Sequence, residues 1–330
     1  MAELMQVIEM AGPGGPEVLS LGQRPIPVPR PEEVLIKVTA AGVNGPDIVQ
    51  RTGAYPPPKG ASDLLGLEIS GTVVRADAAG RWAPGDAVVA LTNGGGYGAY
   101  VAVHVGHCLP LPKGVSPIDG AGLPETFFTV WSNIFHAHPP RAWPRDSIFL
   151  AHGGAGGIGS TAIQLGTARG LRVFTTAAPG ADCAFCRDLG AERAIDFQSE
   201  DFVTILRDAG GARIILDTIG GPYIARNIKA ATPDARIVQL AFNAGSKVEI
   251  DLMPIMLKRI TYTGSTLRSR PDAYKTEIAT ALTREVWPEF ATGRIRPVTH
   301  AVLPFSEARK AHDMMEKAAH RGKLILCPDP

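Results

Sequence analysis

The sequence predicts an α/β protein with a β-rich domain and a second domain built on a doubly wound, six-stranded parallel sheet. Residues 1 to about 120 contain short alternating runs such as "EVLIKVTAAGV" and "DAVVAL", separated by Gly and Pro, which is typical of strands. From Asp146, near-continuous apolar stretches alternate with helical stretches, the pattern of a parallel sheet covered on both faces. The region after about Thr266 is too short for a core of its own, so we expect it to pack on the first region.

The expected elements follow this alternation in order. The six strands of the parallel sheet are "SIFLAH", "LRVFTTA", "RAIDF", "RIILDTIG", "RIVQLAF" and "ITYTGST". Helices between them include "GIGSTAIQLGTARG" and "DFVTILRDAG". The last region predicts a long helix near 272–292, the strand "VTHAVLPF", a helix from an N-cap at Ser306 to about His320, and the strand "KLILC".

Composition limits the classes of partner. Lys and Arg number 33 and Asp and Glu number 32, so charge gives no reason to expect nucleic acid or an anionic membrane. No run approaches the ~18 apolar residues of a membrane span. The N-terminus shows no secretory signal, and four scattered cysteines make no disulfide framework, so we expect a cytoplasmic protein. Cys183 and Cys186 have metal or redox spacing, but they lack a second ligand pair, which favours an ordinary helix face.

The stretch "IFLAHGGAGGIGSTAIQLGTARG" carries the strongest chemical signal. Gly154, Gly156 and Gly159 form a G-x-G-x-x-G motif that follows an expected strand and opens an expected helix. In this context the glycines allow a tight turn, close approach of the backbone to a pyrophosphate, and close helix–strand packing. The sequence therefore predicts a dinucleotide-binding domain.

Several further stretches carry a family resemblance, among them "AAGVNGPDIVQRTGAYPPP", "GDAVVALTNGGGYGAYV", "LPETFFTVW", "DTIGG" and "GSTLRSR". They resemble the zinc-independent quinone oxidoreductase branch of the medium-chain dehydrogenase/reductase superfamily. "PPPKGAS", "NGGGY" and "LRSR" are most similar to its tumour-suppressor-inducible subgroup. The resemblance implies a GroES-like catalytic domain of residues 1–122 and 267–330 and a Rossmann domain of residues 123–266.

The resemblance also implies a homodimer that pairs through the edge of the Rossmann sheet. The candidate edge is "RITYTGST" with the preceding "KVEIDL". An exposed apolar edge strand favours pairing independently of the resemblance, because unpaired edges promote association.

No metal is expected. Where zinc-dependent relatives carry a ligating Cys and His, this chain has Asn44 and Leu67, and Leu cannot ligate. The closely spaced cysteines of a structural zinc lobe are also missing, since residues 80 to 115 contain only Cys108.

The catalytic residues implied by the resemblance are Tyr55 and Asn44, in a cleft between the domains. Tyr55 is either a substrate contact and proton donor or a ring that packs on the Pro56–Pro58 turn. Asn44 either positions nicotinamide or substrate or stabilises its own loop. Glu68 is expected to be structural. The cofactor-binding residues implied are Thr129, Gly154, Gly156, Gly157, Ile158, Gly159, Thr176, Phe197, Leu240, Phe242, Thr266 and Leu267.

The identity of the cofactor depends on the turn after the second strand of this domain. No acidic residue lies at Thr175 to Ala178, where NAD-binding proteins hold the ribose. NADPH-preferring relatives carry Ser and Lys where this chain has Pro179 and Ala181. We therefore expect NADPH with only weak preference, and NADH as the alternative. The nearest cations are Arg172, Arg187 and Arg193.

The predicted function is reduction of a quinone by NAD(P)H through metal-free hydride transfer from nicotinamide C4. Quinone reduction is the first of three functions that stay open. The second is reduction of activated double bonds such as enones, which the same cleft could serve. A non-enzymatic RNA-binding or structural relative is the third reading, and the intact glycine motif and balanced charge argue against it.

Overall fold

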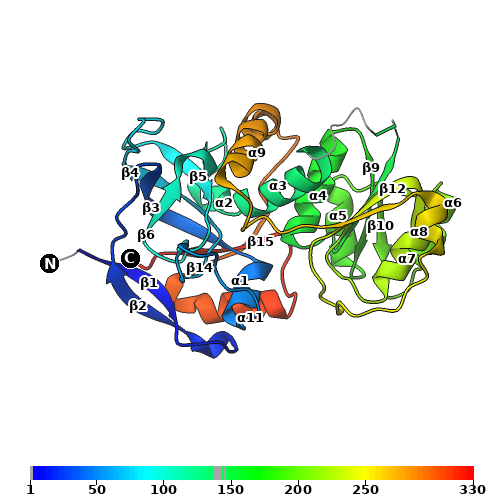
Figure 1. The fold of residues 1–330 in the computed structure, drawn as a ribbon, viewed down its shortest axis with the longest axis horizontal. Coiled ribbons are helices and arrows are strands. Elements are labelled where there is room, and N and C mark those ends of the chain that lie inside the picture. The colour runs from blue at the N-terminus through cyan, green and yellow to red at the C-terminus, as the bar shows by residue number, and fades with distance from the viewer. Residues whose placement is uncertain (1–2, 137–142, 145) are drawn as a thin grey trace. The chain divides into compact units, whose positions relative to one another are not determined.

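The computed structural model describes residues 3–136, 143–144 and 146–330 (Figure 1). The chain divides into two compact units, Met1–Phe128 with Arg268–Pro330, and Thr129–Leu267. Helix α3 (Pro124–Val130) contains the residue at which the chain passes from the first unit to the second.

The second unit contains the parallel sheet. Its strands are β8 (Ile148–His152), β9 (Arg172–Ala177), β10 (Arg193–Asp196), β11 (Ala212–Asp217), β12 (Ala231–Gln239) and β13 (Thr261–Gly264). Its helices are α4 (Gly157–Ala168), α5 (Ala181–Asp188), α6 (Phe202–Asp208), α7 (Tyr223–Ala230) and α8 (Met253–Lys258), with a π-helical turn at Trp131–His136.

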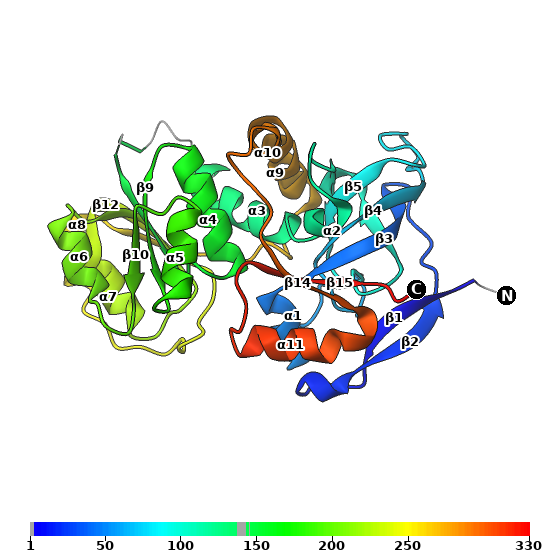
Figure 2. The same cartoon turned by 180° about the vertical axis from the view of Figure 1, so that it is seen from behind.

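The spatial strand order is β10-β9-β8-β11-β12-β13, and each pairing is parallel. This order reverses direction between β8 and β11, as in a doubly wound nucleotide-binding sheet. Figures 1 and 2 show α4 and α5 on one face of the sheet and α6, α7 and α8 on the other. The six-stranded parallel sheet predicted from the sequence is confirmed.

The first unit is β-rich. Its strands are β1 (Leu4–Met10), β2 (Leu19–Pro25), β3 (Glu33–Val43), β4 (Glu68–Arg75), β5 (Ala87–Leu91), β6 (Tyr100–His104), β7 (Cys108–Pro110), β14 (Thr299–Pro304) and β15 (Lys323–Cys327). Its other helices are α1 (Gly45–Arg51), α2 (Pro117–Gly120), α9 (Asp272–Glu285), α10 (Trp287–Ala291) and α11 (Ala308–Glu316), with 3-10 turns at Pro16–Val18, Val105–His107 and Phe305–Glu307.

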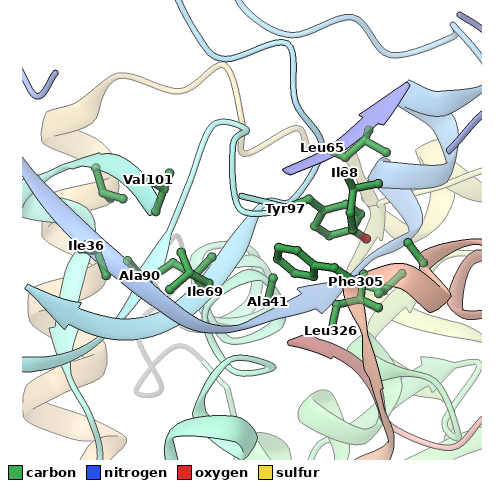
Figure 3. Packing of buried hydrophobic residues seen from close by; sticks show 14 of the residues in the cluster. Ile8, Ile36, Ala41, Leu65, Ile69, Ala90, Tyr97, Val101, Phe305 and Leu326 are labelled. Atoms are coloured by element: carbon green, nitrogen blue, oxygen red, sulfur yellow. The ribbon is translucent and has the colours of Figure 1, made fainter. Parts of the chain in front are cut away.

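Both ends of the chain contribute to one sheet in this unit. Strand β15, from the C-terminus, pairs antiparallel with β3, with Leu326 opposite Ala41. Figure 3 shows Phe305 beside Leu326 and Ala41, and Tyr97 beside Ile8 and Leu65, in one buried apolar cluster. The expectation that the last region packs on the first is therefore confirmed.

Three boundaries differ from the sequence expectations. The long helix near 272–292 is divided into α9 and α10 around Val286, because Pro288 follows in the first turn of α10. Ser306 does not cap α11, since its hydroxyl donates to Asp329 Oδ1 at 2.6 Å. Residues 247–252 form no strand, so only β13 supplies the predicted edge. Among the described residues, no helix is long and apolar enough to cross a membrane.

Candidate active site

The glycine motif forms a rigid turn between β8 and α4. Strand β8 ends at His152, and Gly153 takes a positive φ of 70°, which glycine adopts without strain. The Gly154 amide donates to the Thr176 carbonyl at 2.9 Å, and the Gly156 amide donates to the Gly153 carbonyl at 3.1 Å. These bonds fix the point at which α4 begins.

Steric contacts explain why glycine is needed in this turn. A Cβ atom on Gly159 would overlap the Gly153 carbonyl and lie 2.5 Å from the Gly154 Cα atom. A Cβ atom on Gly154 would lie 2.8 Å from Cys186 Sγ. Position 156 differs, because a Cβ atom there meets only the Gly153 carbonyl oxygen, at 3.6 Å. Gly159 and Gly154 therefore serve the packing of the turn, and the side of Gly156 is open.

The N-terminus of α4 carries no side-chain cap, since its N-cap is Gly156. Helix α6 in the same unit is capped by Asp201, which accepts from the amides of Val203 and Thr204. An uncapped helix start presents N–H donors and the positive end of the helix dipole to an anion. The turn from Gly153 to Gly159 can hold a pyrophosphate in this way.

Behind the turn lies a chain of buried polar side chains that sequence reasoning missed. His152 Nδ1 lies 3.0 Å from Thr176 Oγ1, and His152 Nε2 lies 2.8 Å from Asn227 Oδ1. Asn227 Nδ2 donates to Asp217 Oδ2 at 2.9 Å. All four side chains are at most 2% exposed. A polar residue at the end of each of the apolar strands β8 and β11 was the only sequence signal for them.

The other predicted cofactor residues of this unit differ in exposure. Phe197 directly follows β10 and is 48% exposed, and Phe242 is 47% exposed. Leu267 is buried. Thr266 is exposed. The remaining residues are half-buried: Thr129, Gly157, Ile158 and Leu240.

Cys183 and Cys186 lie on the buried face of α5 as free thiols. Burial raises the pKa of the Cys186 thiol to about 12. These thiols therefore pack the helix against the sheet, as the sequence interpretation favoured.

In the first unit, Asn44 belongs to a buried ionic cluster. Lys323 Nζ donates to Asn44 Oδ1 at 2.5 Å and to the Val43 carbonyl at 3.0 Å, and it pairs with Glu68 Oε1 at 2.7 Å. Asn44 Nδ2 donates to the same Glu68 oxygen at 2.8 Å. Both polar atoms of the Asn44 side chain therefore have protein partners, which favours the reading that it stabilises its own loop. Glu68 is structural in the sense predicted.

Asp47 fixes the backbone of the same loop. Its carboxylate accepts from the Asn44 amide at 2.9 Å and from the Gly66 amide at 3.0 Å. Burial raises the pKa of Asp47 to about 6, although these two hydrogen bonds oppose the shift.

Tyr55 is half-buried, and its ring lies 5.5 Å from the guanidinium carbon of Arg268. Arg268 is held in place because it donates to Gln50 Oε1 and to the Asn93 carbonyl, each at 2.7 Å. Burial and the Glu125 carboxylate raise the pKa of the Tyr55 phenol, and Arg268 partly offsets this. The phenol therefore stays protonated at neutral pH, as a proton donor must.

Glu125 is a titratable group near Tyr55 that sequence reasoning missed. It lies at the start of α3, where its amide donates to Glu68 Oε2 at 2.8 Å. Burial, reinforced by the Glu68 carboxylate, raises the pKa of Glu125 to about 8. No motif indicates this shift, because it depends on burial of Glu125 and on the Glu68 carboxylate that folding brings near it.

Glu125→Gln is expected to remove part of the pH dependence of stability. The folded Glu125 carboxyl keeps its proton up to about pH 8, whereas the unfolded one loses it near 4.5. The contribution of Glu125 to the free energy of unfolding should therefore fall as pH rises between these values and level off above pH 8. Between pH 6 and 8 the slope should be smaller in the variant, as urea unfolding would measure. Glu32→Gln, at an exposed position, is the control, and equal slopes in Glu125→Gln and the natural protein would contradict the assignment.

Two family models match the chain in tandem. One, described as an alcohol dehydrogenase GroES-like domain, matches residues 30–113. The other, described as a zinc-binding dehydrogenase, matches residues 157–283. The chain belongs to the medium-chain dehydrogenase/reductase superfamily, a class of nicotinamide-dependent oxidoreductases.

Individual relatives extend this likeness over almost the whole chain. The quinone oxidoreductase of Mus musculus is 27% identical over 341 residues, which cover 98% of each protein. The crystal structure of Escherichia coli quinone oxidoreductase complexed with NADPH has a TM-score of 0.83 and 25% identity, and covers 98% of this chain and 100% of that one. A structure described as an NAD-dependent alcohol dehydrogenase has a TM-score of 0.84 and 26% identity over 98% and 100% of the two chains.

The residues of this chain do not fit a catalytic zinc ion. The resemblance places zinc ligands at positions 44 and 67. Leu67 is a buried aliphatic side chain, and Asn44 is bound to the Lys323 ammonium. A divalent cation at Asn44 would lie against that ammonium, and like charges at this range in a buried site repel strongly. Among the described residues, no group of three or more His, Cys, Asp or Glu side chains could hold a metal ion.

Proposed function

We propose that this protein is an NAD(P)H-dependent quinone oxidoreductase that works without a metal. The observation that carries the proposal is the hydrogen bond from the buried Lys323 ammonium to Asn44, the residue that stands where the resemblance places a zinc ligand. A quinone is a strong hydride acceptor and needs little polarisation, so it suits a site without a Lewis acid. The near full-length similarity to quinone oxidoreductases supports the same substrate class.

The turn from Gly153 to Gly159 is proposed to hold the pyrophosphate of the cofactor through the uncapped start of α4. Phe197 offers an exposed aromatic face on which an adenine can stack. When bound, the cofactor supplies the hydride that leaves from nicotinamide C4. The contributions of Thr129, Leu240, Phe242, Thr266 and Leu267 around the nicotinamide are proposed on the family resemblance.

Reduction of a quinone to a hydroquinone by one hydride also consumes one proton. Tyr55 is the proposed donor, because its phenol stays protonated and Arg268 beside it stabilises developing negative charge on the phenol oxygen. Asn44 is proposed to act on the reaction through the shape of its loop. We retain the cytoplasm as the proposed location, which the four free cysteines support.

A steady-state assay of NADPH and NADH oxidation against a panel of quinones and enones tests the proposal. Turnover of quinones that exceeds turnover of enones is the expected result. Preference for enones would favour the double-bond reductase instead. Failure to oxidise either cofactor with any acceptor would reject both enzymatic readings and favour a structural or RNA-binding role.

Tyr55→Phe is expected to lower kcat/KM for a quinone and to leave the Kd for NADPH nearly unchanged. If the phenol donates the proton, the loss reaches ~100-fold, and if water substitutes it is only a few-fold. Steady-state kinetics and a cofactor titration measure the two quantities. An unchanged kcat/KM would leave Tyr55 as a packing residue beside Arg268.

The environment of the turn after β9 supports weak cofactor discrimination. Arg172 pairs with Glu192, with Nη2 and Oε1 2.6 Å apart, and Arg193 pairs with Glu200. These two cations are therefore already compensated by carboxylates. Ala181 begins α5 after Gly180 and brings no charge to the place where relatives carry Lys.

The ratio of kcat/KM for NADPH to that for NADH, measured on one quinone, is expected to stay below about 100-fold in either direction, ~2.7 kcal/mol. A charge-assisted contact with the 2′-phosphate is worth ~1.5–3 kcal/mol, and its absence removes most of the discrimination. Ala181→Lys should shift the ratio toward NADPH. A natural ratio above 100-fold would contradict weak discrimination, and no shift in the variant would show that this turn does not meet the phosphate.

We also propose a homodimer formed through β13. This strand is at the edge of its sheet, and α8 beside it in the sequence has no buried residue. Large apolar side chains are exposed there: Leu252 (62%), Met253 (54%), Met256 (64%), Leu257 (66%) and Tyr262 (37%). Such a patch beside an open edge favours association with a second copy. A stable monomer in sedimentation at micromolar protein concentration would reject this assembly.

A further inference from the structure

Four buried side chains behind the glycine turn form one continuous hydrogen-bond chain: Thr176, His152, Asn227 and Asp217. They come from β9, β8, α7 and β11, so the chain crosses the sheet and reaches one of its covering helices. The turn that it meets is the proposed site of the cofactor phosphates, so the inference below rests on the proposed function.

The donors and acceptors of this chain can be assigned from its two ends. The Asp217 carboxylate accepts from the amides of Ile219 at 2.6 Å and Gly220 at 3.0 Å, and also from Asn227 Nδ2. Because the Asn227 amide nitrogen faces Asp217, its oxygen faces His152, and His152 Nε2 must carry the hydrogen.

The tautomer of His152 then determines the role of Thr176. With the hydrogen on Nε2, the neutral ring has only an acceptor at Nδ1, so the Thr176 hydroxyl donates its hydrogen to His152. The lone pairs of Thr176 Oγ1 remain for the amide of Gly153, whose nitrogen lies 3.3 Å away. The backbone carbonyl of Thr176 binds the Gly154 amide. Both amides at the start of the glycine turn therefore bind to one residue that His152 orients.

The surroundings of His152 keep water out and keep the ring neutral. Its ring centroid lies 4.9 Å from those of Phe202 and Tyr223, both in edge-on contact. Burial lowers the pKa of His152, and the Arg226 guanidinium acts in the same direction, while Asp217 and the Asn227 hydrogen bond oppose it. Without competing water, each donor in the chain has one partner available.

We propose that His152 is a positioning residue for the cofactor site. His152 acts through Thr176 to hold Gly153 and Gly154 in the geometry that binds the cofactor phosphates. Gly153 is the corner of the turn, since its carbonyl accepts from the Gly156 amide and lies where a Cβ atom on Gly159 would collide with it. A loss of the His152–Thr176 hydrogen bond therefore reaches the start of α4 through Gly153, whose amide binds Thr176 Oγ1 and whose carbonyl binds the Gly156 amide. Neither His152 nor the Thr176 hydroxyl needs to touch the cofactor for this effect.

Two substitutions at His152 separate positioning from general stability. In His152→Gln the side-chain amide nitrogen takes the place of Nε2 and keeps the bond to Asn227, but the acceptor for Thr176 is lost. In His152→Asn the side-chain oxygen takes the place of Nδ1 and keeps the bond from Thr176, but Asn227 loses its donor. Both variants are expected to melt at a lower temperature than the natural protein.

The Kd for NADPH, measured by fluorescence titration, distinguishes the two variants. We expect His152→Gln to weaken binding about fivefold to tenfold, as the net worth of one hydrogen bond predicts, and His152→Asn to keep the natural Kd within about twofold. Saturating kcat should change little in either variant. Equal weakening in both variants, or none in His152→Gln, would overturn the inference.

Substitutions at Thr176 provide the second test if a His152 variant fails to fold. Thr176→Val removes the hydroxyl and keeps the shape, so it should reproduce the NADPH affinity of His152→Gln, while Thr176→Ser should restore natural affinity. Natural affinity in Thr176→Val would overturn the inference while leaving the proposed function intact. If the natural protein does not bind NADPH in this titration, the proposed function and the inference fall together.

Discussion

Replacing Gly159 by alanine is expected to lower kcat/KM for NADPH by about 100-fold, because a displacement of the turn by about 1 Å is enough for such a loss. The new methyl group would overlap the Gly153 carbonyl and lie 2.5 Å from the Gly154 Cα atom. Both contacts are with backbone, which cannot rotate away as a side chain can. Forced overpacking should also destabilise the free protein by about 1–3 kcal/mol.

Gly156→Ala is the matched variant for this experiment. Its methyl group would meet only the Gly153 carbonyl oxygen, at the ordinary distance of 3.6 Å. The free variant should therefore melt at the natural temperature, yet bind NADPH more weakly if the pyrophosphate approaches position 156. Thermal melting and cofactor titration measure the two effects. Natural NADPH kinetics in Gly159→Ala would contradict the assignment of this turn to the cofactor.

Lys323→Met is expected to reduce the free energy of unfolding by about 3–5 kcal/mol, the loss that follows when one partner of a buried ion pair is removed. The Lys323 ammonium donates to Asn44 Oδ1 and the Val43 carbonyl and neutralises Glu68, whose side chain is fully buried. Without Lys323, the Glu68 carboxylate keeps only the hydrogen bonds from Asn44 Nδ2 and the Glu125 amide. A buried charge then stays uncompensated.

The double variant Lys323→Met/Glu68→Gln is the control, because it removes both charges together. It should recover much of the lost stability in denaturant unfolding, although Asn44 still loses a donor to its side-chain oxygen. A single variant within about 1 kcal/mol of the natural protein would show that the cluster does not hold this loop. A double variant no more stable than the single one would show that charge burial is not the reason.

The sequence was sufficient for the architecture because its signals were local. Each strand of the parallel sheet is an apolar run bounded by turn residues, and each was predicted as such. The errors arose where contacts between distant parts of the chain decided the structure. Residues 247–252 alternate in polarity but pair with no described strand. Ser306 binds Asp329, 23 residues away, and does not cap a helix.

The site was predictable only where a motif marks it. The glycines were found because their G-x-G-x-x-G spacing between a strand and a helix is typical of a dinucleotide-binding turn. Lys323 and His152 were not assigned, since their roles depend on partners 279 and 75 residues away in the sequence, at Asn44 and Asn227. The shift of the Glu125 pKa depends on burial and on the carboxylate of Glu68, and no spacing rule predicts either.

Metal-free quinone reduction is tested most directly by quinone-dependent oxidation of NADPH by protein that has been treated with a strong metal chelator. We expect the nicotinamide absorbance to disappear in step with hydroquinone formation, at the same rate before and after chelation. Activity that chelation abolishes and added zinc restores would contradict a metal-free site in which Lys323 binds Asn44. Protein that does not oxidise NADPH with any quinone, chelated or not, would contradict the proposed function itself.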